Sequence, residues 1–144
     1  RRNEIEETVA QRQLTNVTLQ PMLQSDAYLR LVADADLFLV SLAPMVRYPV
    51  IPSKIGDAMA AGRPILAALP EGDAAELILS SGAGVVVPPA YGTKLADAIV
   101  TLAQDSSRCR AMGLAGHAYA RIHLNTEVVL PKLRNVLADA TTQQ

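Results

Sequence analysis

Residues 52–64 read Pro52-Ser53-Lys54-Ile55-Gly56-Asp57-Ala58-Met59-Ala60-Ala61-Gly62-Arg63-Pro64. This run predicts one short helix in which both ends are marked. Ser53 is a good N-cap residue, because its hydroxyl oxygen can accept hydrogen bonds from the amides of the first turn. Gly62 and Pro64 predict the stop, since glycine commonly follows a helix and proline cannot continue one. We therefore expect a helix that begins at Ser53 and ends before Gly62.

A hydroxyl, a cation and a carboxylate gather at the start of this helix. Ser53 and Asp57 lie four residues apart, and Lys54 and Asp57 three apart, so all three share one part of the helical surface. The free amides of a helix start favour a phosphate, and the carboxylate could accept both hydroxyls of a ribose. The pattern favours a nucleotide diphosphate as ligand. The simpler alternatives are that Ser53 only caps the helix and that Asp57 only pairs with Lys54.

The composition limits the class of protein. Half of the 144 residues are apolar, which is enough for one domain with a core. The net charge of −1 and the 3% of aromatic residues provide no basic patch or stacking surface, so we expect no nucleic-acid partner. Cys109 is the single cysteine, which excludes an internal disulfide. No apolar run has the length of a membrane span, and no metal site is expected.

Short apolar runs alternate with helical patterns along the rest of the chain. Strands are expected at residues 17–19, 37–42, 64–69 and 84–89. Besides the helix at Ser53, helices are expected at residues 3–13, 27–35, 73–80, 92–104, 106–122 and 126–139. This alternation predicts right-handed βαβ units. The expected fold is therefore α/β, with a Rossmann-like parallel sheet flanked by helices.

Local signals add detail to three of these helices. Asp26 should cap the helix at 27–35, which is expected to bury the side chains Leu29, Val32 and Ala33. Asp73 and Glu76 have the spacing of a capping box for the helix at 73–80. Pro131 should kink the last helix or delay its start, because proline lacks the amide hydrogen that a helix interior uses.

Three motifs occur in an order that resembles a known family. They are Val32-Ala33-Asp34-Ala35-Asp36, Asp57-Ala58-Met59-Ala60-Ala61-Gly62-Arg63-Pro64-Ile65-Leu66-Ala67 and Val86-Val87-Pro88-Pro89. From Asn16 to Leu137 the chain resembles the second half of the C-terminal, nucleotide-binding lobe of GT-B glycosyltransferases, specifically the large retaining family 4. Residues 52–64 are similar to members that build capsule, O-antigen or other surface polysaccharides. The resemblance implies that residues 1–144 are a partial donor-binding lobe, with the acceptor lobe absent from this chain.

The resemblance also implies an activity. Such an enzyme transfers a sugar from a UDP- or GDP-linked donor to an acceptor hydroxyl, with retention of the anomeric configuration, and uses no cofactor or catalytic metal. The implied partners are the nucleotide-sugar donor, an acceptor such as a lipid-linked saccharide, and the N-terminal acceptor lobe of the same polypeptide. The implied location is the cytoplasm, including the inner face of the membrane. These residues alone are not expected to catalyse the reaction.

The resemblance assigns roles at the helix of residues 52–64. By position, Asp57 matches the carboxylate that binds the ribose hydroxyls in the family. Ser53, Lys54 and the amides around Ile55 would meet the diphosphate or the start of the donor sugar. The resemblance therefore implies a donor site at the start of this helix, with no residue assigned as catalytic.

Further donor contacts are implied on either side. Tyr48 and Val50 belong to the loop beside the sugar, and Met22 belongs to the segment that lies along the nucleotide base. Pro49 stands where the family has its first glutamate, and proline cannot accept a hydrogen bond from a sugar hydroxyl. Recognition of the donor sugar is therefore expected to differ from the family pattern.

The family also has two strands and a glycine-rich loop that would precede residue 1. Those strands would lie between the strand near Val17 and the strand near Phe38. We therefore expect direct pairing of these two strands, an oligomer that fills the gap, or a longer polypeptide. Two alternative functions remain open at this point. One is a flavodoxin-like binding module that uses the same sheet, and the other is a GT-B nucleotide-sugar epimerase.

Overall fold

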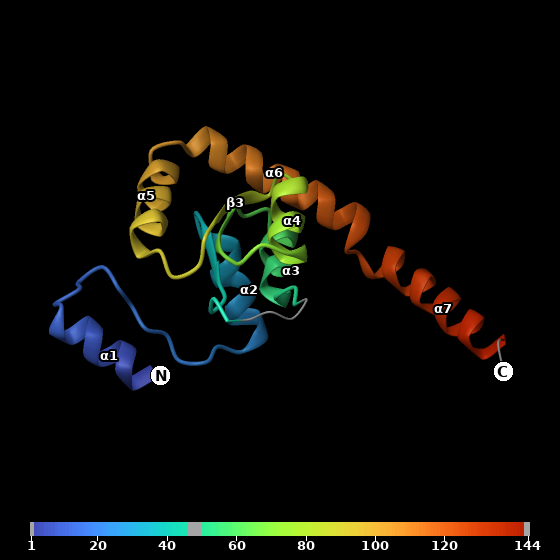
Figure 1. Cartoon of the computed structure of the whole chain (residues 1–144), viewed down its shortest axis with the longest axis horizontal. Helices are drawn as coiled ribbons and strands as arrows, with labels where there is room; N and C mark the ends of the chain where they lie inside the picture. The colour runs from blue at the N-terminus through green and yellow to red at the C-terminus, as the bar shows by residue number, and fades with distance from the viewer. Residues whose placement is uncertain (1, 46–49, 143–144) are drawn as a thin grey trace.

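A three-stranded parallel sheet forms the centre of the computed structural model, which describes residues 2–45 and 50–142 (Figure 1). The strands are β1 (Phe38–Ser41), β2 (Ile65–Ala68) and β3 (Gly84–Val87), in the order β1-β2-β3. In register, Phe38 pairs with Ile65 and Ile65 with Gly84. The predicted α/β fold with a parallel sheet flanked by helices is confirmed.

Each helix expected from the sequence is present within the described residues. The helices are α1 (Arg2–Gln11), α2 (Ser25–Asp34), α3 (Ser53–Ala60), α4 (Asp73–Ser80), α5 (Gly92–Ala103), α6 (Ser106–His123) and α7 (Thr126–Thr142). Figure 1 shows α1 apart from the sheet at the end of a long coil, and α7 running away from it at the other end of the chain. Pro131 lies inside α7 and does not delay its start.

The core lies on both faces of β2, whose four residues are all buried. Because side chains alternate along a strand, Ile65 and Ala67 belong to one apolar cluster and Leu66 and Ala68 to another. The first cluster is completed mainly by residues of α3, α4 and α6, among them Ile55, Met59, Ala75, Ile78 and Ala120. The second contains Leu102 of α5 and Met112 of α6. Burial of α3 against the first face fixes the direction in which its first turn points.

The expected strand at residues 17–19 is wrong, because this segment is coil. A strand needs a hydrogen-bonded neighbour, and the described sheet consists of β1, β2 and β3 alone. Direct pairing between this segment and β1 is therefore not formed. β1 is instead an edge of the sheet, and Leu39 is 49% exposed. The continuous apolar run at residues 37–42 therefore forms a strand that is not covered on both faces.

The predicted buried side of α2 is correct at one position of three. Val32 is buried, whereas Leu29 and Ala33 are exposed. α2 packs mainly against α3, so it has fewer apolar neighbours than a helix inside a complete layer. The hydrophobic pattern identified the helix, and the missing neighbours determine which of its apolar side chains are buried.

Three predicted caps are also wrong. Ser53, Asp26 and Asp73 are helical residues, and the N-cap positions before them belong to Pro52, Gln24 and Gly72 without a side-chain hydrogen bond. At Gly72 the backbone φ is 143°, a conformation that favours glycine, so the neighbouring aspartate cannot take this position. Two described caps do use their side chains: Asn125 Oδ1 accepts from the Glu127 amide at the start of α7, and Asp105 accepts a 2.9 Å hydrogen bond from the Arg108 amide. That bond lowers the pKa of Asp105.

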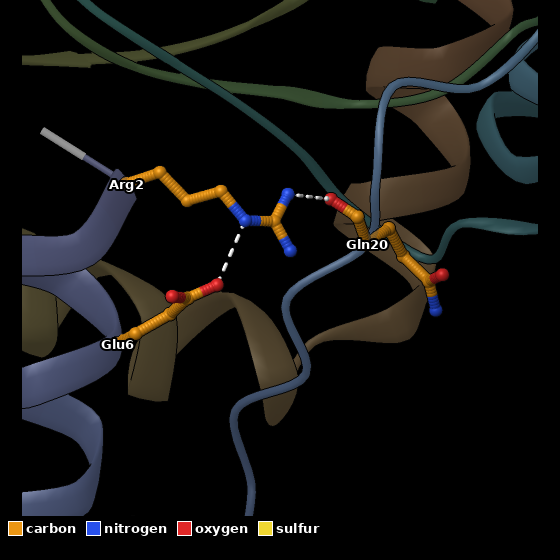
Figure 2. A network of polar contacts seen from close by, with 3 residues as sticks. All are labelled: Arg2, Glu6 and Gln20. Atoms are coloured by element: carbon orange, nitrogen blue, oxygen red, sulfur yellow. Dashed lines mark hydrogen bonds and ion pairs between the residues drawn. The ribbon is translucent and has the colours of Figure 1, made fainter.

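A small polar network joins α1 to the coil before α2 (Figure 2). The Arg2 guanidinium lies 2.7 Å from Glu6 Oε1, one turn along α1, and donates a 3.0 Å hydrogen bond to the Gln20 carbonyl oxygen. Both partners are exposed, so the ion pair contributes little to stability. The hydrogen bond from Arg2 to Gln20 holds the coil near the start of α1.

Candidate functional site

The first turn of α3 points into solvent, while the body of the helix is anchored in the core. Ile55, Ala58 and Met59 are buried, and their spacing places them on one helical face. Ser53 and Lys54 are exposed. α3 follows β1, so its start lies beyond the carboxyl end of that strand, where parallel α/β sheets commonly bind ligands. The arrangement leaves the helix start accessible to a ligand.

The amides of this first turn are partly available. The Ile55 amide donates to the Pro52 carbonyl oxygen at 3.0 Å, so a ligand would have to compete for it. The amides of Ser53 and Lys54 donate to no carbonyl of the described residues. The first turn contains no acidic residue and carries the Lys54 cation, so an anion would find both free donors and a favourable charge.

Asp57 is held by a tyrosine that the sequence analysis did not identify. The Tyr28 hydroxyl donates to Asp57 Oδ2 at 3.0 Å, across 29 residues of sequence. Both side chains are half-buried. Burial raises the pKa of Tyr28, and the hydrogen bond and the negative charge of Asp57 raise it further. The phenol therefore stays protonated near neutral pH and acts as the donor.

This contact answers one question left open by the sequence. The simpler alternative was that Asp57 only pairs with Lys54. Within residues 2–45 and 50–142, the ion pair that the structure contains is Arg2 with Glu6, and the partner of Asp57 is Tyr28. Lys54 is thus free to meet a ligand, and Asp57 Oδ1 is not the oxygen to which Tyr28 donates.

The remaining predicted site residues that the structure describes lie outside α3. Val50 is 45% exposed in the coil before α3, and Met22 is 99% exposed in the coil before α2. The structure therefore brings Ser53, Lys54 and Asp57 together on α3 and leaves Met22 almost fully exposed. Tyr48 and Pro49 lie outside the described residues.

A separate cavity of about 600 Å³ lies at the amino ends of β1 and β2, away from the start of α3. Its lining includes Arg63, Cys109 and Arg110. One Arg63 nitrogen donates to the Ala35 carbonyl oxygen at 3.3 Å, whereas its buried Nε has no hydrogen-bond partner among the described residues. The Cys109 thiol donates to the Leu102 carbonyl oxygen.

The described part of the chain contains neither a metal-binding cluster nor a membrane-spanning helix. No group of three His, Cys, Asp or Glu side chains there is arranged to hold a metal ion. No helix in the same residues has both the length and the apolar character needed to cross a membrane.

Comparison with protein families identifies the chain. Residues 1–105 match the model of the glycosyl transferases group 1. The chain belongs to this glycosyltransferase family. The match includes α2, α3 and the whole sheet, and therefore the candidate site. No curated protein sequence matches the chain.

Solved structures share the fold of this glycosyltransferase chain. Sucrose-phosphate synthase from Thermosynechococcus elongatus has a TM-score of 0.84 at 22% identity, over 99% of this chain and 35% of that one. HepE from Anabaena, in complex with UDP, has a TM-score of 0.79 at 23% identity, over 95% of this chain and 36% of that one. The C-terminal domain of LpcC from Francisella tularensis has a TM-score of 0.63 at 18% identity, over 86% and 62% of the two chains.

These likenesses confirm the predicted GT-B C-terminal lobe architecture of the glycosyltransferase chain. The chain spans about a third of the length of the first two structures. HepE has been solved with UDP and with UDP-glucose. At these identities the comparison establishes the fold alone.

Proposed function

We propose that this chain is the donor-binding part of a retaining glycosyltransferase. The enzyme would transfer a sugar from a nucleotide-diphosphate sugar to an acceptor hydroxyl. The observation that carries the proposal is the exposed start of α3, where Lys54 and free amides stand one turn before the tethered Asp57. Membership in the glycosyltransferase family supports it, as does the UDP-glucose complex of HepE.

In this proposal the first turn of α3 binds the diphosphate. Ser53, Lys54 and the amides around Ile55 would face the negative charge that accumulates on the nucleotide diphosphate as the glycosidic bond breaks. Donors that are already in place stabilise such charge without reorganising during the reaction. Because the Ile55 amide is engaged with Pro52, we assign the main contribution to Ser53 and Lys54.

The other donor contacts follow the predicted arrangement. Asp57 would accept the ribose hydroxyls, Val50 and Tyr48 would border the sugar, and Met22 would cover one side of the base. The 99% exposure of Met22 fits a residue that becomes buried only when a base or another part of the polypeptide covers it. No metal or cofactor takes part in the proposed reaction.

The larger enzyme belongs to the same proposal. Residues 1–144 would form part of the C-terminal lobe, and an acceptor lobe of the same polypeptide would bind a lipid-linked or other saccharide. A family 4 enzyme of surface-polysaccharide or O-antigen synthesis fits the motif at residues 52–64. The proposed location is the cytoplasm, including the inner membrane face, and it rests on the family resemblance alone.

Calorimetric titration of the intact protein with UDP, GDP and FMN tests the proposal. We expect binding of UDP or GDP and none of FMN. Lys54→Ala should lower the affinity for the nucleotide about 10- to 100-fold, since a hydrogen bond to a charged group contributes roughly 1.5–3 kcal/mol. Lys132→Ala, which removes an exposed cation on α7, is the matched control and should leave the affinity unchanged. Binding of FMN alone, or equal affinities in the two variants, would contradict the proposal.

A further inference from the structure

We propose that Tyr28 is a positioning residue that orients the Asp57 carboxylate for recognition of the ribose. The proposal rests on the proposed function, because it assigns a part to the same donor site. Its basis is the 3.0 Å hydrogen bond from the Tyr28 hydroxyl to Asp57 Oδ2. This bond joins α2 to α3, two helices that also lie against each other.

The hydrogen bond from Tyr28 gives the two carboxylate oxygens of Asp57 different roles. An ionised carboxylate offers about four acceptor positions on its two oxygens, and Tyr28 occupies one of them on Oδ2. The terminal torsion of an aspartate has broad energy wells, so an untethered carboxylate would turn freely. With Oδ2 fixed, Oδ1 and the second lone pair of Oδ2 have a defined direction. Two adjacent ribose hydroxyls are donors that can use this pair of acceptors together.

A neutral phenol can position the Asp57 carboxylate without competing for it, whereas a cation would compete. A lysine or arginine at the same place would form an ion pair and compete with the ligand for the negative charge of Asp57. The neutral Tyr28 hydroxyl fixes the carboxylate and adds no positive charge that would compete with the ligand. The raised pKa of Tyr28 keeps the hydroxyl protonated over the neutral range. Tyr28 is half-buried in α2, so its ring is held while its hydroxyl reaches Asp57.

The alternative is that the bond only fastens α2 to α3. Tyr28→Phe separates the two cases, since it keeps the ring and its packing and removes only the hydroxyl. If the bond only fastens the two helices, Tyr28→Phe should lower thermal stability and reduce the affinity for every nucleotide equally. If Tyr28 positions the carboxylate, Tyr28→Phe should reduce the affinity most for ligands that bind through their ribose hydroxyls. The ratio of affinities for a ribonucleotide and its 2′-deoxy form therefore distinguishes the roles.

The experiment measures this ratio by calorimetry in the intact protein. The probes are UDP and GDP, whichever the unmodified protein binds, and the corresponding 2′-deoxynucleoside diphosphate. We expect Tyr28→Phe to lower the affinity for the ribonucleotide about 3- to 10-fold, the loss typical of one hydrogen bond. The affinity for the deoxynucleotide should change less than about 2-fold. Tyr91→Phe, at an exposed tyrosine before α5, is the matched control and should change neither value.

Two further results complete the test. In an Asp57→Asn background, adding Tyr28→Phe should cause no additional loss of ribose preference, because the two residues act through one carboxylate. If Tyr28→Phe leaves the ratio of the two affinities unchanged, the positioning role is wrong while the donor site stands. If the unmodified protein binds neither UDP nor GDP, the proposed function is wrong and this inference fails with it.

Discussion

At Gly113 on α6, an added Cβ would overlap the carbonyl oxygen of Gly62, which follows α3. Gly62 itself has a φ of 66°, a backbone conformation that favours glycine. Beside this contact, His117 Nδ1 lies 2.9 Å from the Ala60 carbonyl oxygen at the end of α3. The close approach of α6 fixes the C-terminal end of α3, and hence the direction in which its first turn points.

The residue-scale prediction is that Gly113→Ala destabilises the fold. Because the added methyl group meets backbone rather than a movable side chain, we expect a loss of about 1–3 kcal/mol in the free energy of unfolding. Gly92→Ala is the control, since nothing lies within 4 Å of a Cβ built at that helical glycine. Urea denaturation checks both variants. An unchanged midpoint for Gly113→Ala would contradict the close packing of α6 on α3.

The same scale shows what sequence could reveal about the site. Ser53, Lys54 and Asp57 were identified because helical periodicity brings neighbours in sequence onto one surface. Tyr28 was missed because its contact with Asp57 spans 29 residues and depends on how α2 packs on α3. No spacing rule encodes such a contact. The wrong cap at Ser53 has a local cause instead, because the preceding residue, Pro52, takes the cap position.

Among the elements, β1 is the strand with an incomplete environment. The Phe38 and Leu42 amides donate to Pro64 and Ala68 at the β2 side. Since successive amides point in opposite directions along a strand, those of Leu39 and Ser41 point away from β2. Leu39 is also half-exposed. An edge of this kind is a template for a further strand, and we propose that another part of the donor lobe pairs with it in the intact protein.

Amide hydrogen exchange of the intact protein tests this element-scale prediction. If a further strand pairs with β1, the Leu39 and Ser41 amides should exchange as slowly as those of Phe38 and Leu42, which serve as internal references. The protection would arise because hydrogen-bonded amides exchange only when the structure opens. Rapid exchange at Leu39 and Ser41 beside slow exchange at the references would mean that the edge stays unpaired.

The elements themselves were largely predictable. Continuous apolar runs at residues 37–42, 64–69 and 84–89 became the three strands, because buried parallel strands need apolar residues on both faces. Residues 17–19 have a similar β-prone composition but remain coil. The difference lies in the neighbours, since a strand is stable only when another strand pairs with it, and a local pattern does not contain that information.

At the scale of the whole molecule, two separate regions are candidate ligand-binding sites. The start of α3 lies at the carboxyl end of β1, whereas the cavity near Arg63 and Cys109 lies at the amino ends of β1 and β2. The lining of this cavity includes neither the exposed helix start nor the tethered carboxylate. We propose that the nucleotide binds at the start of α3.

The most direct test is the location of nucleotide binding, measured by amide chemical-shift changes when UDP or GDP is titrated into the isotopically labelled intact protein. We predict the largest changes at Ser53 and Lys54, with smaller changes at Asp57 and Tyr28. Changes concentrated at Arg63 and Cys109, with the first turn of α3 unaffected, would contradict the account.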